Sequence, residues 1–302
     1  MIELLLVAAV GLVLAGVMFG DDGDSDSDSD DTPPMEEEPP VDTEGIELFY
    51  DGAQILEGTE GDDTLAAGQD AALTPPDQID LGGGDDIAIV GQAISITLNG
   101  EEGDDTLTST GVQNVLNGGA GDDALFGITA VDMNGGAGND TITLDNDFDS
   151  NSDTARIDGG NGDDDIRIIA DAGVNNPVNF TQVLGGAGND DFALTLELVS
   201  SQEDFDVRDD ILQGSIIAIE DFDPRNETLR IEIDPDEDNI DRQVSNILFE
   251  QEETDGEFNT EIAITFAATE DAFASVSTLT VRSADPFGIE AIEFAGLNMA
   301  QT

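Results

Sequence analysis

The amino-acid sequence predicts an all-β protein built mainly from stacked coils of short strands, and three observations support this class. A Gly- and Asp-rich motif, here called the repeated phrase, occurs seven times between about residues 46 and 200. A short apolar segment follows each copy, which is typical of a strand. The remaining residues, 201–302, contain further short apolar segments separated by turn-forming residues.

The charge of the chain restricts its partners. The 302 residues include 70 Asp and Glu against seven Arg and no Lys, so the formal net charge is -63. We expect no nucleic acid partner, because phosphates would repel such a chain. The acids are neutralised either diffusely, as in a salt-adapted protein, or by hard divalent cations that prefer carboxylate oxygen. Salt adaptation predicts scattered acids, whereas many acids here stand at fixed offsets from glycines.

The residue types that are absent exclude several chemistries. The chain has no His and no Cys, which excludes Ser-His and Cys-His nucleophile pairs, typical zinc sites and a disulfide framework. We therefore expect that the protein is not an enzyme. The alternative is a polysaccharide-active β-solenoid enzyme that uses carboxylates as acid and base. Such enzymes generally hold sugar with aromatic or basic residues, but this chain has no Trp and one Tyr, Tyr50.

Residues 1–20, MIELLLVAAVGLVLAGVMFG, are predicted to form a hydrophobic anchor or signal segment. The apolar run from Leu4 to Phe19 is at the short limit for a helix that crosses a bilayer of ~30 Å. We expect a hydrophobic helix that anchors the chain in a membrane through residues 2–19. A cleaved signal peptide and a buried core helix are the alternatives. A membrane anchor or a cleaved signal peptide would place the rest of the protein at the cell surface or outside the cell.

Residues 21–45 are predicted to form an acidic disordered linker. They alternate Asp with Ser and then cluster Pro with Glu, so they bury too little apolar surface to offset the entropy lost on ordering. Repulsion between the like charges extends the linker.

The seven copies of the repeated phrase begin at Gly58, Gly82, Gly100, Gly118, Gly135, Gly159 and Gly185. One Asp recurs in each copy at about eighteen-residue intervals, with longer intervals toward the end: Asp63, Asp86, Asp105, Asp123, Asp140, Asp164 and Asp190. A fixed period of this length predicts coils that stack on one another.

The fourth copy, GGAGDDALF, matches the nonapeptide G-G-x-G-x-D-x-U-x in full, where U is a large apolar residue. These residues resemble the RTX or haemolysin-type calcium-binding repeat of exported bacterial proteins. The resemblance implies a parallel β-roll, the RTX-type solenoid, over residues 46–200. It also implies that two nonapeptides form one coil. Because the spacing is near eighteen, each coil is expected to carry one motif turn and one plain turn, with all motif turns on the same side.

The resemblance further implies that several Ca²⁺ ions are the cofactors, each shared by two consecutive turns. The expected ligands are Asp carboxylates and backbone oxygens of the Gly-rich loops: Asp63, Asp86, Gly100, Gly103, Asp105, Gly118, Gly121, Asp123, Gly135, Gly138, Asp140, Gly159, Gly162, Asp164, Gly185, Gly188 and Asp190. Coils lie about 4.8 Å apart. Carboxylates at that spacing repel by roughly 1 to 3 kcal/mol per pair, which a divalent cation reverses. The alternative is that these segments are tight turns with solvated Asp.

Some copies depart from the motif. The second copy, GGGDDIAI, is interpreted as lacking one residue between its glycines, with Ala88 at the apolar position. Thr59 and Glu101 replace the second glycine in the first and third copies. The two longest intervals predict loops inserted on the plain side, around residues 145–154 and 171–177.

Residues 201–302 are predicted to form a C-terminal β-rich capping domain, a small antiparallel sheet or sandwich over the open end of the roll. Its segment IAIEDFDPRNETLRI resembles the region that often follows such repeats, and its acids are expected on the surface. The function predicted for the whole chain is calcium binding that stabilises an exported or cell-surface β-roll. A calcium-dependent adhesive or surface-layer protein is a further alternative.

Overall fold

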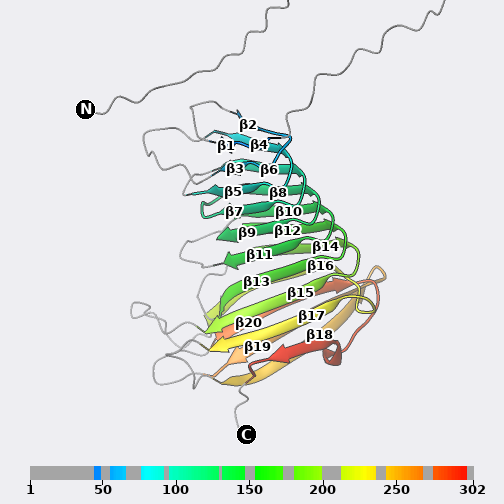
Figure 1. Ribbon diagram of the computed structural model, residues 1–302. Helices are drawn as coiled ribbons and strands as arrows, with labels where there is room; N and C mark the ends of the chain where they lie inside the picture. The colour runs from blue at the N-terminus through cyan, green and yellow to red at the C-terminus, as the bar shows by residue number, and fades with distance from the viewer. Residues whose placement is uncertain are drawn as a thin grey trace, which may run out of the picture. The chain divides into compact units, whose positions relative to one another are not determined.

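The computed structural model describes residues 44–48, 55–65, 76–91, 95–128, 131–146, 154–172, 180–198, 212–235, 243–267 and 275–297. These residues form two large sheets, and up to residue 254 the strands alternate between them along the chain, so each coil contributes one strand to each sheet (Figure 1). Consecutive coils pair in parallel. The predicted all-β fold with stacked parallel coils is therefore present.

Sheet A contains, in spatial order, β1 (Glu47–Leu48), β3 (Thr64–Leu65), β5 (Ile87–Val90), β7 (Thr106–Ser109), β9 (Ala124–Ile128), β11 (Thr141–Asn146), β13 (Asp165–Ala172), β15 (Asp191–Leu198), β17 (Thr228–Pro235) and β21 (Ile292–Ala295). Sheet B contains β18 (Val244–Thr254), β19 (Glu257–Phe266), β20 (Ser275–Ser283), β16 (Leu212–Phe222), β14 (Phe180–Ala187), β12 (Thr154–Asn161), β10 (Asp132–Ala137), β8 (Val115–Ala120), β6 (Thr97–Glu102), β4 (Gln78–Gly83) and β2 (Ile55–Thr59). A short 3₁₀ helix, η1 (Ile289–Ala291), precedes β21.

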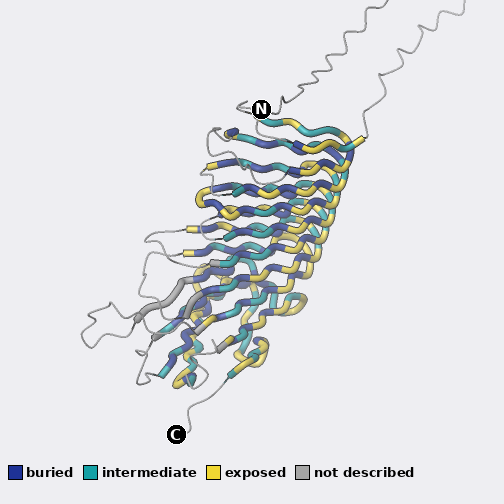
Figure 2. Tube along the Cα trace, turned by 60° about the vertical axis from the view of Figure 1, so that its left-hand side comes forward, coloured by how far each residue is buried: buried dark blue, intermediate teal, exposed yellow. Residues whose placement is uncertain are grey.

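The hydrophobic core lies between the two sheets. Residues of the motif coils alternate along their strands between buried positions and more exposed ones, as in β5 and β9 and in the colours of Figure 2. The apolar residue that follows each Gly-rich turn faces inward, and parallel pairing places it directly over its equivalent in the next coil. These apolar residues include Leu65, Leu107, Leu125, Ile142, Ile166 and Phe192, which are all buried.

A ladder of polar side chains runs along the outer face of sheet B. The side-chain amide of Asn117 donates to Oδ1 of Asn99 (2.7 Å), and the amide of Asn99 donates to Oδ1 of Asp80 (2.6 Å). These residues occupy equivalent positions in β4, β6 and β8. A one-residue slip between coils would separate these partners, so the ladder helps to fix the register.

The strands after residue 200 differ from the predicted separate antiparallel domain. β16 and β20 extend sheet B in parallel, and β17 and β21 extend sheet A in parallel. Among the strands that the structure describes, antiparallel pairing is confined to β18, β19 and β20. The solenoid therefore continues beyond the last glycine phrase, because a strand needs only a paired neighbour and a buried face, whatever turn precedes it. Val41–Thr302 form one compact unit.

The two longest motif intervals contain their extra residues toward the plain side, but partly in longer strands rather than only in the predicted loops: β12, β13 and β14 have eight residues each, whereas β7 has four and β8 has six. β11 ends at Asn146 and β12 begins at Thr154, and β13 ends at Ala172 and β14 begins at Phe180. Both connections run from sheet A to sheet B, opposite the motif turns. The predicted anchor, residues 1–20, and the linker up to residue 43 lie outside the described residues. The part of the chain that is described contains no helix with the length and apolar character needed to cross a bilayer.

Candidate metal-binding turns

All seven Gly-rich turns lie along one edge of the solenoid, as predicted. Each turn leads from a strand of sheet B to the next strand of sheet A, for example from β6 to β7 and from β8 to β9. We call the recurring buried residue of each turn the inner aspartate, and no inner aspartate is more than 2% exposed. These residues are Asp63, Asp86, Asp105, Asp123, Asp140, Asp164 and Asp190. Seven carboxylates are therefore withdrawn from solvent in one column.

The inner aspartates form a continuous hydrogen-bonded ladder. Oδ1 of Asp123 accepts the backbone N–H of Asp105, one coil earlier, at 2.8 Å. Oδ1 of Asp140 accepts the N–H of Asp123 in the same way, also at 2.8 Å. The same bond recurs from the second turn to the seventh. One oxygen of each carboxylate thus holds the preceding turn in place.

A second ladder runs outside the first and in the opposite direction. From the first turn to the sixth, the exposed residue before the inner aspartate accepts the N–H of its equivalent in the following coil. For example, Oδ1 of Asp104 accepts the N–H of Asp122 at 2.8 Å. Sequence reasoning missed this role, although an Asp or Asn precedes every inner aspartate. The members are Asp62, Asp85, Asp104, Asp122, Asn139, Asp163 and Asn189.

The second carboxylate oxygen of the inner column has no partner from the second turn onward. Oδ2 is buried and accepts no hydrogen bond in Asp86, Asp105, Asp123, Asp140, Asp164 and Asp190. A buried, unpartnered carboxylate oxygen is costly, because nothing replaces its lost hydration. Such a set of atoms requires a compensating positive group or a bound proton.

In four turns a backbone oxygen lies beside this unpartnered carboxylate oxygen. A side-chain carbon placed on Gly100 would collide with Oδ2 of Asp105 and with the carbonyl oxygen of Gly118 in the next coil. These two oxygens therefore border the same small space. The pattern repeats at the next three turns, around Asp123 and Gly135, Asp140 and Gly159, and Asp164 and Gly185.

The glycines of these turns have two separate roles. The first glycine of the motif, such as Gly118, has no room for a side chain because the inner carboxylate fills that space. The fourth residue, such as Gly121, has a φ of 141° and donates its N–H to the carbonyl oxygen of Ala137 at 2.8 Å. The Gly residues predicted as ligands thus lie in the turns, next to the inner aspartates.

Burial raises the pKa of the inner carboxylates from the second turn to the seventh. For Asp123 the pKa is raised to about 7, first by burial and then by the carboxylates of Asp140 and Asp105, while the N–H of Asp105 opposes the shift. Burial is also the main cause of the raised pKa values of Asp86, at about 7, and of Asp164 and Asp190, at about 6. The column therefore resists carrying negative charge unless a cation compensates it.

The second turn corrects one part of the sequence interpretation. Gly82 pairs with Glu101 and Gly83 with Glu102, so the second copy lacks no residue. Instead, Leu81 occupies the position of the first glycine, and its side chain is fully buried. The predicted start of this copy, Gly82, is one residue too late, because a run of three glycines hides which motif glycine is replaced.

The column ends at a turn that has no glycine phrase. Asp191 pairs with Thr228 in the next coil. This pairing places Glu227 at the position in that coil that is equivalent to Asp190. Burial, followed by the carboxylates of Asp190, Asp221 and Asp223, raises the pKa of Glu227 to about 7, although the N–H of Asp223 opposes the shift. The sequence provided no signal for this residue, because its place follows only from the pairing of β15 with β17.

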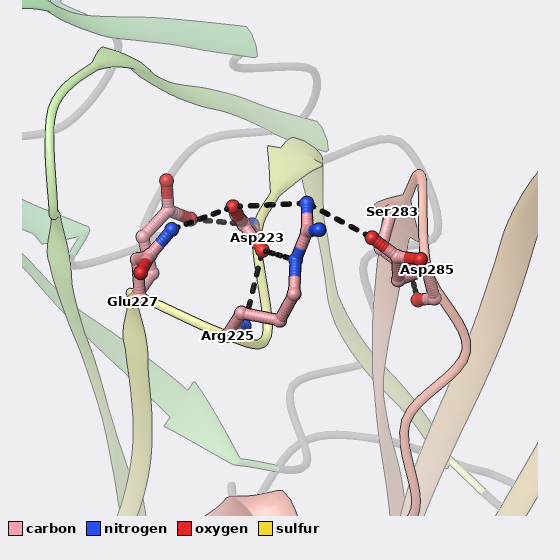
Figure 3. A network of polar contacts seen from close by, with 6 residues as sticks. Asp223, Arg225, Glu227, Ser283 and Asp285 are labelled. Carbon is pink, nitrogen blue, oxygen red and sulfur yellow. Dashed lines mark hydrogen bonds and ion pairs between the residues drawn. The ribbon is translucent and has the colours of Figure 1, made fainter.

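Other acids of this turn are engaged by protein groups. Oδ1 of Asp223 accepts the Nε–H of Arg225 at 3.0 Å, and Arg225 also pairs with Asp285 at 3.0 Å (Figure 3). The two carboxylate oxygens of Asp221 accept the N–H groups of Gly185 and Gly186. The sequence predicts that the acids of this segment lie on the surface. That expectation fits Asp223 better than Glu227.

Within the described ranges, no three acidic side chains converge in a way that could hold a metal by themselves. Any ion in the turns would therefore combine one or two carboxylates with backbone oxygens. Searches against protein-family models and against curated proteins find no match for this chain.

Proposed function

We propose that the chain is an RTX-type β-roll that binds Ca²⁺ ions along the column of inner aspartates. One observation carries the proposal: a buried, unpartnered Oδ2 faces a backbone carbonyl oxygen of the next coil in four consecutive turns. Two oxygens that share a space without a hydrogen between them repel each other. A cation between them turns this repulsion into coordination.

The donor set favours calcium over other biological cations. It consists of carboxylate and carbonyl oxygens, and the chain has no His or Cys to attract zinc or copper. Ca²⁺ accepts six to eight oxygen ligands in flexible geometry, which suits carbonyls that are fixed by a turn. Mg²⁺ requires near-ideal octahedral geometry and retains several waters, which a buried column accommodates poorly. The third to sixth turns, with Asp105, Asp123, Asp140 and Asp164, carry the complete oxygen pairs.

The proposed role of the ions is to stabilise the folded roll outside the cytoplasm. The buried negative charge makes the metal-free column unfavourable, so the free energy of ion binding becomes free energy of folding. Extracellular modules typically bind Ca²⁺ with dissociation constants of about 10⁻⁴–10⁻³ M. Sites of that affinity would bind Ca²⁺ outside the cell and release it inside. The apolar segment of residues 2–19 supports export, with the protein anchored at or released from the cell surface.

Calcium-dependent folding of the full chain in mild detergent tests the proposal. We expect circular dichroism to show a gain of β structure when calcium is added to chelator-treated protein, with a much smaller gain for equal magnesium. The Asp105→Asn and Asp123→Asn double variant should need more calcium for the same gain. The matched control is the Asp104→Asn and Asp122→Asn double variant, which removes the same charge from exposed positions of the same turns.

The proposal fails if the β content and the unfolding midpoint are the same in calcium and in chelator. It also fails if the two double variants respond equally to calcium, because diffuse neutralisation of a polyanion does not distinguish inner from outer acids.

A further inference from the structure

The first turn differs from the other six in how its inner aspartate is held. Oδ2 of Asp63 accepts the backbone N–H of Thr59 at 2.6 Å, whereas Oδ2 has no partner in each later turn. Oδ1 of Asp63 accepts the N–H of Ile46 at 2.6 Å and the hydroxyl of Thr59 at 3.0 Å. Both oxygens of this buried carboxylate are therefore satisfied by the protein.

The difference arises at the second motif position. Thr59 stands where later turns have a glycine or Glu101, and its φ lies outside the left-handed region. The equivalent residues of the second to seventh turns all have positive φ, for example Glu101 at 81° and Gly119 at 125°. A β-branched residue strongly disfavours positive φ. Thr59 therefore keeps a backbone conformation in which its N–H points at Asp63.

The oxygen pair itself is still present in the first turn. A side-chain carbon on Gly58 would collide with Oδ2 of Asp63 and with the carbonyl oxygen of Leu81, as at the equivalent glycines of the third to sixth turns. The hydroxyl of Thr59 also accepts the N–H of Gly61 at 3.2 Å, which tightens the turn. The feature that separates this turn from the third to sixth turns is thus a hydrogen-bond donor at Oδ2 of the carboxylate.

We infer that Thr59 makes the first turn a metal-free end cap, so that Asp63 is not a calcium ligand and the ion column begins after it. This inference rests on the proposed function and refines it. A backbone N–H and a hydroxyl replace the cation between the first and second turns, at the N-terminal end of the column. The end of the roll then stays closed at calcium concentrations too low to fill the column.

The number of tightly bound Ca²⁺ ions per chain tests the cap. Equilibrium dialysis of the full chain against labelled calcium, in about 1 M NaCl, counts these ions while the salt screens diffuse binding. Asp63→Asn should bind the same number of ions as the wild type and as its matched control, Asp62→Asn, which removes an exposed charge from the same turn. Thr59→Gly should bind one ion more, because it completes the glycine pattern. Adding Asp63→Asn to Thr59→Gly should remove that ion again.

The cap is refuted if Asp63→Asn binds one ion fewer than Asp62→Asn, or if Thr59→Gly gains none. Thr59→Gly keeps the test decisive even where Asp63→Asn disturbs the first coil. If the wild type binds no ions tightly, the proposed function itself fails. A different result refutes only the cap: the wild type binds ions tightly, and the Asp63→Asn variant binds one ion fewer.

Discussion

Asp123 accepts the backbone N–H of Asp105 through Oδ1 at 2.8 Å, while its Oδ2 is buried without a partner. One half of the carboxylate thus joins two coils and the other half destabilises the metal-free turn. Every inner aspartate from the second turn to the seventh repeats this division. The same residue is therefore expected to stabilise or destabilise the fold according to whether calcium is bound.

Replacement of Asp123 by Asn should change stability in opposite directions with and without calcium. The amide keeps an acceptor for Asp105 and places an N–H₂ donor beside the carbonyl oxygen of Gly135. In chelator we expect Asp123→Asn to be more stable than the wild type by about 1 to 3 kcal/mol. In saturating calcium it should be less stable. Urea unfolding under both conditions checks this, with Asp122→Asn expected within about 0.5 kcal/mol of the wild type in each.

The stability of the metal-free protein should fall as pH rises from about 4 to about 7. The pKa of Asp86 and of Asp123 rises from 3.8 to about 7 on folding, so the folded state binds more protons than the unfolded chain in this window. Each carboxylate that titrates contributes up to about 1.4 kcal/mol per pH unit. Urea unfolding of metal-free protein at pH 5 and pH 8 measures the fall. Saturating calcium should make this loss of stability at pH 8 smaller. If the stability of the metal-free protein rose with pH instead, that result would contradict the burial of charged carboxylates.

Replacement of Gly100 by Ala should destabilise the third turn through a collision. The added carbon would overlap Oδ2 of Asp105 and the carbonyl oxygen of Gly118. We expect a cost of about 1 to 3 kcal/mol, measured by thermal or urea unfolding in calcium. Gly256→Ala is the control, because a carbon there meets nothing within 4 Å and only its φ of 87° carries a cost. Equal effects of the two variants would show that the space beside Gly100 is not filled.

Replacement of Phe222 by Ala should weaken the C-terminal end of the solenoid. The ring of Phe222 is 1% exposed and packs edge-on against Phe192 and Phe287, at centroid distances of 6.1 and 5.3 Å. Its removal leaves a cavity between the last motif coil and the strands that follow, with an expected cost of about 3 to 5 kcal/mol. Phe180→Ala, at a residue 38% exposed, should cost much less. Similar unfolding midpoints for both variants would mean that this end is not continuous with the core.

The seven copies of the Gly- and Asp-rich phrase predicted the stacked coils and the single-sided turns. They did so because a coil of about eighteen residues must bring the same residue type to the same place each time. The inner aspartates and the buried apolar residues after them follow from this repetition. Sequence reasoning could not find the outer ladder or Leu81. The first depends on which N–H group each exposed side chain meets, and the second depends on the pairing register of β4 with β6.

The sequence by itself thus determined the repeating unit, the edge on which the acids lie and the exclusion of His and Cys chemistry. Only the tertiary structure decided which carboxylate oxygens are satisfied. The motif gives Asp63 and Asp123 the same place, yet the N–H of Thr59 reaches Oδ2 of Asp63 and no donor reaches Oδ2 of Asp123. It also decided that Glu227 takes the position of an inner aspartate in the coil after Asp190. The physical reason is that a hydrogen bond depends on positions to within a few tenths of an ångström, whereas a sequence pattern specifies only order and spacing.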